Sequence, residues 1–275
     1  MINLQNIMFI CVNYNNSRYT EKFIKSLLQQ NNINPRFKIS MLVVDNSTDL
    51  SEIQLLKNLC ELNSEFVKLI IAEENLGYFG GLNYGLSQIN HLDYDFIIIG
   101  NNDLEFKDDF CCNLLDKKIN LDVLALVPEV ITSDGVQQNP HVLKPISWVK
   151  RFEYDIFYLH WYVAEFLFFI KYNIFKQTRK HPLIKYSPQP IHMGIGAIYI
   201  LTKNFFKFYS QLDFPLFLYG EEAFFSHQIH KVNGVIMFEP DLVVYHAESA
   251  ATSKLAKRKV YEYSKKGYPL YRKYL

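Results

Sequence analysis

Short apolar runs alternate with amphipathic stretches over the first half of the chain. Five runs that end abruptly in polar residues predict buried strands, at residues 7–12, 39–44, 67–72, 96–99 and 123–130. Apolar residues at helical spacing predict helices between these runs, at residues 20–30, with Thr20 as a candidate N-cap, 50–62 and 80–89. Because the strands are apolar on both faces, the alternation is typical of a parallel α/β sheet covered by helices on both sides.

The pattern changes in the second half of the chain. Residues 147–180 contain both tryptophans, Trp148 and Trp161, among many Phe and Tyr residues and scattered charges. This composition predicts an aromatic helical insertion too charged to cross a membrane. It leaves two roles open: lying on a membrane surface, or packing against the sheet or a sister subunit. From Pro190 the alternation resumes, with predicted strands at 195–201, 235–238 and 242–245 and helices at 203–210 and 223–232.

Polar residues directly follow four of the predicted strands. The four strand ends are Asn13-Tyr14-Asn15, Asp45-Asn46-Ser47, Glu74-Asn75-Leu76-Gly77 and Asn101-Asn102-Asp103. In a parallel sheet these ends share one edge, which is where open α/β sheets bind ligands. Any one of them alone is ordinary turn chemistry. Four in succession predict a crevice in which four loops converge.

Two segments indicate what this crevice binds. ENLGYFGGLNYG, residues 74–85, is a glycine-rich turn that opens a helix, and IIIGNNDLEF, residues 97–106, is a strand that ends in amides and Asp103. A single carboxylate among amides suits a hard divalent cation that is shared with phosphate oxygens. The pair therefore predicts a nucleoside-diphosphate site. The chain lacks the G-x-G-x-x-G and G-x-x-x-x-G-K-[ST] motifs, which argues against nicotinamide dehydrogenases and P-loop enzymes.

Length and charge add a few constraints. The 275 residues suffice for one large α/β domain or for a domain with an appendage. A net charge of +1 gives no reason to expect a nucleic-acid partner. Residues 254–275, however, contain eight Lys or Arg, one acid and five tyrosines, which predicts a basic C-terminal helix. A solvated helix and one that faces an anionic membrane or substrate both remain open.

The cysteines and the apolar runs bear on location. The four cysteines match no zinc spacing, and adjacent ones rarely pair, so free thiols in a reducing cytosol are expected. The N-terminus has no basic region followed by a long apolar stretch, so we expect no signal peptide. No run approaches the roughly 18 apolar residues of a spanning helix. The expected location is cytoplasmic, with peripheral contact to the inner face of the cell membrane.

In their order, these segments resemble those of the family 2 glycosyltransferases with a GT-A fold. The likeness is greatest to the rhamnosyltransferase-like and galactofuranosyltransferase-like branch, which builds bacterial surface polysaccharides. The N-terminal matches are FICVNYNNSRYTEKFIKSL, LVVDNSTD, ENLGYFGGLNYGL and IIIGNNDLEF, the last standing where the family has its D-x-D or N-x-D triplet. The acceptor-side matches are HMGIGAIYILTKNFF, FPLFLYGEEAFFSHQIHKVNG and VVYHAESAATS.

The resemblance implies one GT-A domain over residues 1–275, a Rossmann-like, mostly parallel sheet with helices on both faces. It would comprise a nucleotide-sugar half (1–130), the insertion (147–180), an acceptor half (190–250) and a basic tail (251–275). The residues implied to bind the nucleotide sugar are Asn13, Tyr14, Asp45, Asn75, Gly77, Gly80, Asn83, Asn101 and Asn102. Asp103 would hold Mg²⁺ or Mn²⁺ on the diphosphate, with His246 as a second contact. Glu222 would be the general base, with Glu221 beside it.

The implied reaction is an inverting, metal-dependent hexosyl transfer in bacterial surface polysaccharide biosynthesis. The donor would be a nucleoside-diphosphate sugar, preferably of UDP or dTDP, and the acceptor a saccharide on a lipid carrier. Two departures affect this reading. The N-N-D triplet lacks one carboxylate, and Glu222 replaces an aspartate, so that Glu221 stays an alternative base. They keep open a non-catalytic alternative, a nucleotide-sugar-binding subunit of a polysaccharide assembly complex.

Overall fold

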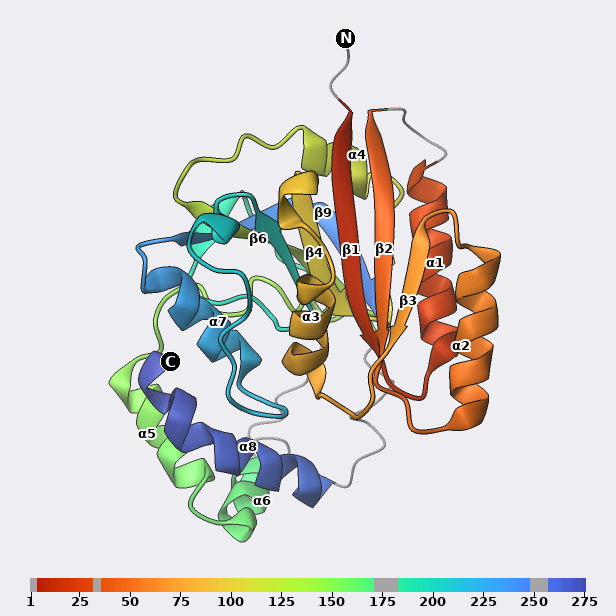
Figure 1. Ribbon diagram of the computed structural model, residues 1–275. Coiled ribbons are helices and arrows are strands. Elements are labelled where there is room, and N and C mark those ends of the chain that lie inside the picture. Colours follow the sequence, from red (N-terminus) through yellow and green to blue (C-terminus); the bar gives the residue numbers. More distant parts are fainter. Residues whose placement is uncertain (1–3, 32–35, 171–182, 248–256) are drawn as a thin grey trace.

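A computed structural model of the chain describes residues 4–31, 36–170, 183–247 and 257–275 (Figure 1). Its centre is a nine-stranded sheet with the strand order β3-β2-β1-β4-β8-β6-β9-β5, to which β7 adds by pairing with β9. The strands β1 to β4 are parallel to their neighbours within this group, and so are β6 and β9. The predicted α/β class with a mostly parallel sheet is confirmed.

The first half of the chain follows the prediction closely. Its elements are β1 (Gln5–Asn13), α1 (Ser17–Asn31), β2 (Phe37–Asp45), α2 (Leu50–Leu62), β3 (Val67–Ile71), α3 (Tyr78–Ser87), the 3₁₀ turn η1 (His91–Asp93) and β4 (Phe96–Asn101). One detail was wrong: Thr20 is not the N-cap of α1 but lies buried inside it. Its hydroxyl donates to Asn13 Oδ1 at 3.0 Å, which ties α1 to the end of β1.

The second half departs more from the prediction. Its sheet-forming part comprises β5 (Leu104–Phe106), α4 (Phe110–Leu115), β6 (Val123–Thr132), β7 (Gln189–Ile191), β8 (Ile198–Thr202), η3 (Phe205–Lys207), α7 (Glu221–His230) and β9 (Val235–His246). The predicted helix at 203–210 is only the 3₁₀ turn η3. The strands predicted at 235–238 and 242–245 are one strand, because a bulge near Pro240 interrupts its register with β6 without ending it.

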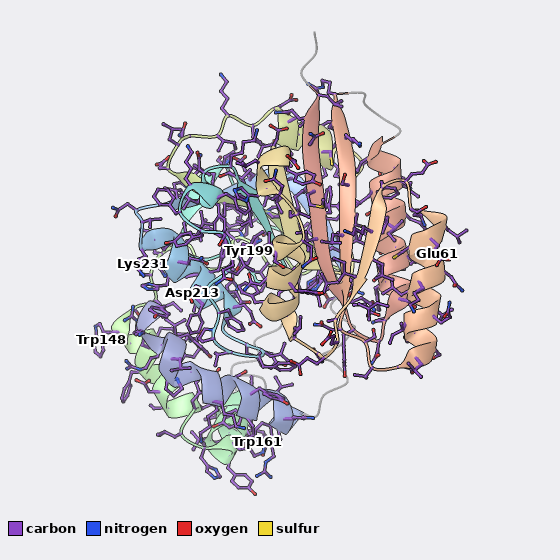
Figure 2. All side chains as sticks on the ribbon, viewed as in Figure 1. Glu61, Trp148, Trp161, Tyr199, Asp213 and Lys231 are labelled. Atoms are coloured by element: carbon purple, nitrogen blue, oxygen red, sulfur yellow. The ribbon has the colours of Figure 1, made fainter. Side chains whose placement is uncertain are left out.

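The sheet is buried on both faces. Side chains of β1 alternate between two apolar clusters, with Phe9 in one and Ile10 in the other. The helices α1, α2 and α4 cover the first cluster, and α3, η3 and α7 cover the second. In the second cluster Tyr199 is fully buried, with its ring 4.0 Å from that of Phe225 (Figure 2). This packing fixes the helix termini that surround the carboxyl ends of the strands.

Three further helices form what we call the helical module: α5 (Trp148–Phe157), α6 (Trp161–Phe169) and α8 (Lys257–Tyr271), which continues into η4 (Arg272–Tyr274). They lie together beside α7 and away from the central strands (Figure 1). The predicted insertion is helical as far as it is described, and its residues 171–180 lie outside the described part. So do residues 251–256 of the predicted tail. Across the ranges that the structure describes, no helix combines the length and apolarity needed to cross a membrane.

Candidate active site

The last residues of β1, β2 and β4 lie side by side at the carboxyl edge of the sheet. Asn13 is the register partner of Asp45, and Asn101 is the partner of Val12. The glycine-rich turn follows β3, which pairs with β2 on its other side. The predicted convergence of four strand ends at one edge is therefore confirmed.

Asp45 is fully buried at this edge, and its two carboxylate oxygens differ in their contacts. Oδ1 accepts from Asn13 Nδ2 at 2.9 Å and from the hydroxyl of Ser47 at 2.5 Å. Oδ2 is buried and has no hydrogen-bond partner in the described residues. A buried acceptor without a partner is costly, about 1–3 kcal/mol. An N–H or O–H group of a ligand would satisfy it.

Two of the predicted binding amides are held by the protein itself. Asn102 Nδ2 donates to Asn13 Oδ1 and to Thr20 Oγ1, both at 2.9 Å. Asn83 donates from Nδ2 to the Leu212 carbonyl at 2.9 Å and accepts the Leu212 amide on Oδ1 at 2.7 Å. These contacts lock strand ends and a loop around the crevice. The structure thus gives Asn102 and Asn83 supporting positions, and their contact with a donor remains a prediction.

The glycine-rich turn has a backbone that requires glycine. Gly77 has φ 73° and ψ −172°, a region almost restricted to glycine. A Cβ there would lie 2.4 Å from the Phe217 carbonyl oxygen. Asn75 Oδ1 accepts the Gly77 amide at 3.0 Å, and Asn46 Nδ2 donates to the Gly77 carbonyl at 2.9 Å. The predicted residues Asn75 and Gly77 therefore shape the floor between the β2 and β3 loops.

Replacing Gly77 with Ala is expected to lower the free energy of unfolding by about 3 kcal/mol, because the strained φ and ψ and the contact with Phe217 add together. Gly135 is the matched control, since it has φ 84° but no atom of the described residues lies within 4 Å of where its Cβ would stand. Gly135→Ala should cost only about 1–2 kcal/mol. Urea denaturation of both variants measures the difference. Equal losses would show that the Phe217 contact is unimportant.

Tyr14 and Gly80 are less constrained. Tyr14 follows β1 and is 37% exposed at the rim of the crevice. Gly80 lies in the first turn of α3, where a Cβ would come 3.2 Å from Leu76 Cβ, a tight but adjustable contact. Neither residue is held by the contacts that fix Gly77, and the contact of Tyr14 and Gly80 with a nucleotide sugar stays a prediction.

A carboxylate and an imidazole meet where β4 and β9 end. Asp103 Oδ1 lies 3.2 Å from His246 Nε2, and both side chains are buried. Asn101 Nδ2 lies 3.3 Å from the same nitrogen. The β5–β9 pairing sets this distance, since Leu104 is the register partner of His246. Gln138, which the sequence analysis did not identify, orients the ring through a 2.8 Å contact between its Oε1 and His246 Nδ1.

These groups fit a divalent cation that takes most of its ligands from a diphosphate. Within the described ranges, no three or more His, Cys, Asp or Glu residues gather in a way that could hold a metal ion. Asp103 and His246 offer one oxygen and one nitrogen, which is too few for Mg²⁺ or Mn²⁺ on their own. The contact of His246 with Gln138 is the kind of outer interaction that orients a ligating histidine.

The two adjacent acids occupy the first turn of α7 and point to different partners. Glu221 is buried, and its Oε1 accepts the Tyr219 amide at 2.9 Å. Burial and the neighbouring charge of Glu222 raise the pKa of Glu221 above its usual range. Glu222 is half-buried, and its Oε1 accepts the Gly196 amide at 3.1 Å. Glu222 is thus the more accessible carboxylate, and Glu221 is directed into the protein.

The raised pKa of Glu221 predicts a specific pH dependence of stability. The folded state holds this proton more tightly than the unfolded state, so the unfolding free energy should fall as pH rises above 4.5, the ordinary carboxyl value. Glu221→Gln, which stays neutral, should remove this part of the pH dependence. Urea denaturation over a pH series compares the two proteins. The same decline in the variant would assign it to other groups.

Tyr78 ties the start of α3 to the Gly196 segment, whose amide Glu222 accepts. This first residue of α3 donates its hydroxyl to the Gly196 carbonyl at 2.8 Å. Burial, followed by the charges of Glu221, Glu222 and Asp103, raises its pKa well above the usual value. The glycine at 196 leaves room for Glu222, because a Cβ there would lie 2.8 Å from Glu222 Oε1. In the sequence, the only sign of the contact between Tyr78 and Gly196 is that Tyr78 directly follows the Gly77 turn.

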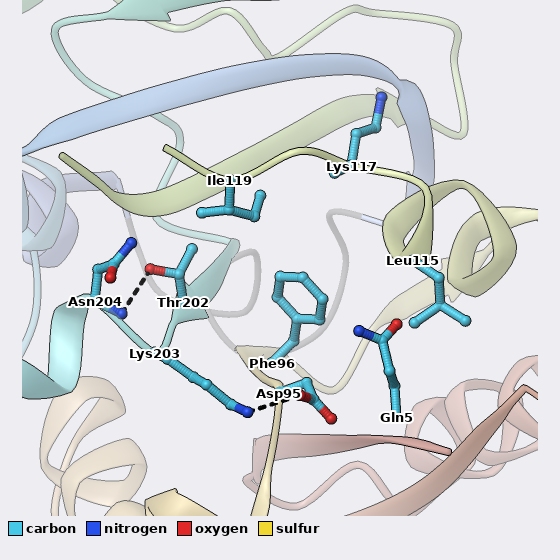
Figure 3. Close-up of a pocket in the computed structure, with 9 residues that line it drawn as sticks. All are labelled: Gln5, Asp95, Phe96, Leu115, Lys117, Ile119, Thr202, Lys203 and Asn204. Atoms are coloured by element: carbon cyan, nitrogen blue, oxygen red, sulfur yellow. Dashed lines mark hydrogen bonds and ion pairs between the residues drawn. The ribbon is translucent and has the colours of Figure 1, made fainter. Parts of the chain in front are cut away.

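A separate hollow lies at the opposite end of β4 and is not part of this crevice. Figure 3 shows its lining, which includes Phe96 at the start of β4, Thr202 at the end of β8, and the ion pair of Lys203 with Asp95 at 2.7 Å. The hollow faces the amino-terminal end of β4, whereas Asn101 and Asp103 are at its carboxyl end. None of the predicted site residues lines it.

Comparison with solved structures identifies the fold. The chain resembles GalNAc-T7 bound to UDP, GalNAc and Mn²⁺ (16% identity, TM-score 0.61, 89% of this chain and 44% of that one). It resembles mannosyltransferase PcManGT of Pyrobaculum calidifontis bound to GDP-Man and Mn²⁺ (14% identity, TM-score 0.56, 90% of this chain and 58% of that one). It also resembles S. aureus TarS residues 1-349 bound to UDP-GlcNAc (15% identity, TM-score 0.55, 92% of this chain and 61% of that one). The chain thus spans about half the length of these proteins, and at such identities the likeness shows the fold alone.

The predicted GT-A fold is confirmed by this likeness. A search of curated proteins found no match. A family model described as glycosyl transferase family 2 matches residues 8–183, which is more than half of the chain. The rhamnosyltransferase-like or galactofuranosyltransferase-like branch stays a prediction. From the model match and the shared fold, we conclude that this chain belongs to glycosyl transferase family 2.

Proposed function

We propose that this protein transfers a sugar from a nucleoside-diphosphate sugar to a hydroxyl of a saccharide acceptor, with inversion at the anomeric carbon. One observation carries the proposal. Glu222 and the Asp103–His246 pair are brought to the same end of β4: Glu222 accepts the Gly196 amide, and the carbonyl of the next residue, Ala197, accepts the Asn101 amide at 2.9 Å, two positions before Asp103. A base for the acceptor and a cation site for the leaving group are the two elements that such a transfer requires.

The residues have separate roles in this proposal. Asp45 holds the base and ribose at the end of β2, with its Oδ2 accepting from the ligand, and the fully buried Asn13 positions this carboxylate through its 2.9 Å hydrogen bond to Oδ1. Asp103 and His246 would hold Mg²⁺ or Mn²⁺, which when bound stabilises negative charge on the departing diphosphate. Glu222 accepts the proton of the acceptor hydroxyl as it attacks the anomeric carbon. Attack opposite the leaving group inverts the configuration without a covalent intermediate.

The proposal also extends to the substrates. The solved structures named above contain UDP, GDP-Man or UDP-GlcNAc, which supports a nucleotide donor and leaves its base open. We keep UDP or dTDP as the preferred nucleotide. For the acceptor, we propose a lipid-linked saccharide in bacterial surface polysaccharide synthesis, with the protein in the cytoplasm.

A donor screen tests the proposal. Purified protein is mixed with UDP-, dTDP- and GDP-sugars and a crude lipid-linked acceptor extract, and released nucleoside diphosphate is measured with Mn²⁺, Mg²⁺ or EDTA. Release from one donor that EDTA abolishes is expected. No release from any donor, combined with a thermal shift by one nucleotide, would favour the binding-subunit alternative, which the single carboxylate of the N-N-D triplet motivates.

Gly196→Ala is expected to lower kcat by about tenfold to a hundredfold, because its Cβ would lie 2.8 Å from Glu222 Oε1 and must displace the carboxylate. The KM for the donor should change little, since Asp45 and Gly77 are untouched. Gly135→Ala is the control, as the described residues leave its surroundings open. A change in KM alone would mean that Gly196 serves donor binding rather than the position of Glu222.

A further inference from the structure

The helical module exposes several large apolar side chains on its surface. Trp148 is 79% exposed on the outer side of α5, and Phe166 is 62% exposed on α6 (Figure 2). The exposed apolar side chains of α5, α6 and the turn between them are Trp148, Val149, Phe152, Leu159, Tyr162, Phe166, Phe168 and Phe169. Monomeric soluble proteins rarely expose so many together, and a patch of this kind usually marks an interaction site.

The module also concentrates positive charge. Residues 147–170 and 257–275 carry nine Lys or Arg and four Asp or Glu, although the whole chain has a net charge of only +1. One of the acids, Asp155, is neutralised by Arg272, with Nη2 to Oδ2 at 2.5 Å. Arg258, Lys259 and Lys266 are exposed on α8. The module therefore exposes both aromatic side chains and excess cations.

The module is fixed beside the proposed base. Tyr268 and Tyr271 of α8 are buried, and Tyr268 donates to Asp155 Oδ1 at 2.6 Å. The ring of Tyr271 would lie 2.5 Å from a Cβ on Gly220, the residue before Glu221. In Figure 1 the module lies at the end of the molecule towards which β1 and β2 point. The described part of the predicted basic tail, residues 257–275, thus packs against the start of α7, where Glu221 and Glu222 lie.

From these contacts we propose that the module is a docking surface for an anionic lipid bilayer. Its aromatic side chains enter the interface between headgroups and acyl chains, and its cations meet anionic headgroups. The helices α5 and α6 have 10 and 9 residues, so they lie on a bilayer rather than cross it. This docking would bring a lipid-linked acceptor beside Glu222, an inference that rests on the proposed function.

Charge argues against a second copy as the occupant. A two-fold dimer through this surface would place two net-positive modules against each other, and like charges across an interface are unfavourable. An anionic bilayer complements the same charge and also accepts the aromatic side chains. The bilayer is therefore the occupant that satisfies both properties of the surface.

Vesicle flotation of the full chain tests this proposal. Vesicles of phosphatidylcholine alone are compared with vesicles of phosphatidylcholine and phosphatidylglycerol in equal amounts. The aromatic variant combines Phe152→Ser and Phe166→Ser, and its matched control combines Leu62→Ser and Leu92→Ser, which are 85% and 76% exposed far from the module. Point variants are used because removing α8 would uncover the side chains of α5 and the following turn on which Tyr268 packs, Tyr154 and Tyr158.

The unaltered chain should float with the anionic vesicles and much less with the neutral ones. The aromatic variant should bind about tenfold more weakly or worse, because two large apolar side chains no longer enter the bilayer. Its control should bind like the unaltered chain. Lys259→Glu with Lys266→Glu should remove the preference for anionic vesicles, while Lys57→Glu on α2 should not.

Three results would overturn the proposal. The first is no flotation of the unaltered chain with either vesicle. The second is equal binding by the aromatic variant and its control. The third is a dimer in light scattering that only the aromatic variant dissociates, which would assign the surface to a second copy. Donor turnover is measured separately, without vesicles. A chain that floats but releases no nucleoside diphosphate would contradict the proposed function and still support the docking surface.

Discussion

Replacing Glu222 with Gln is expected to lower kcat by about a thousandfold, within the usual contribution of a positioned general base. Glutamine keeps an oxygen that can accept the Gly196 amide, so the local structure should survive. It cannot take the proton of the attacking hydroxyl. In the proposed mechanism Glu222 contacts the acceptor and not the nucleotide, so the affinity for the donor nucleotide should stay unchanged. Initial rates over a donor series, with nucleotide affinity from calorimetry, measure both quantities.

The matched control is Glu61→Gln, an exposed acid on α2 at the far side of the molecule (Figure 2). It should leave both kcat and nucleotide affinity unchanged. Glu221→Gln tests the alternative base. If that variant lost turnover while Glu222→Gln kept it, the assignment of the two acids would have to be exchanged.

Replacing Asp103 with Ala is expected to lower kcat/KM by about a hundredfold or more, because the diphosphate loses the group that would hold its cation. The change also leaves His246 without the carboxylate 3.2 Å from its Nε2. Residual turnover should require a higher Mn²⁺ concentration than the unaltered protein does. Rates over a Mn²⁺ titration measure the effect.

Asp116→Ala is the control for this change, since its side chain is 66% exposed and forms a surface ion pair with Arg36. It should leave the Mn²⁺ dependence unaltered. Full activity of Asp103→Ala in EDTA would contradict a cation at this position, and the diphosphate charge would then have to be met by other groups.

The first half of the fold could be predicted because its signals are local. The strands β1 to β4 are apolar on both faces, and their polar ends share an edge once the sheet is parallel. Gly77 and Asp103 stand in continuous motifs, so the sequence revealed them without any knowledge of tertiary contacts. The same reasoning placed Asn13 and Asp45 together, and their register confirms this neighbourhood.

Other parts depend on contacts between distant segments. Gln138 reaches His246 across 108 positions, and Tyr78 reaches Gly196 across 118. No periodicity signals such pairs. The strands β5 and β7 have three residues each, too short for a periodic pattern. The turn signal of Pro240-Asp241 split β9 in two, because a bulge and a loop have the same local composition.

The helical module shows a third limit of prediction from the sequence. Its aromatic and basic composition was evident, but the partition between buried and exposed side chains was not. Tyr268 and Tyr271 pack inside, whereas Trp148 and Phe166 face outward. Both sets have the same chemistry in the sequence. Only the fold separates the side chains that hold the module on α7 from those that are free to meet a bilayer.

One measurement tests the central claim most directly: the amounts of nucleoside diphosphate and glycosylated product formed by the purified protein from its donor and an acceptor extract. The account predicts equal amounts of both, formation that depends on the acceptor, and loss of both in Glu222→Gln. Nucleoside diphosphate without glycosylated product would indicate hydrolysis of the donor. Neither compound, despite tight nucleotide binding, would contradict the account and assign the protein to nucleotide-sugar binding alone.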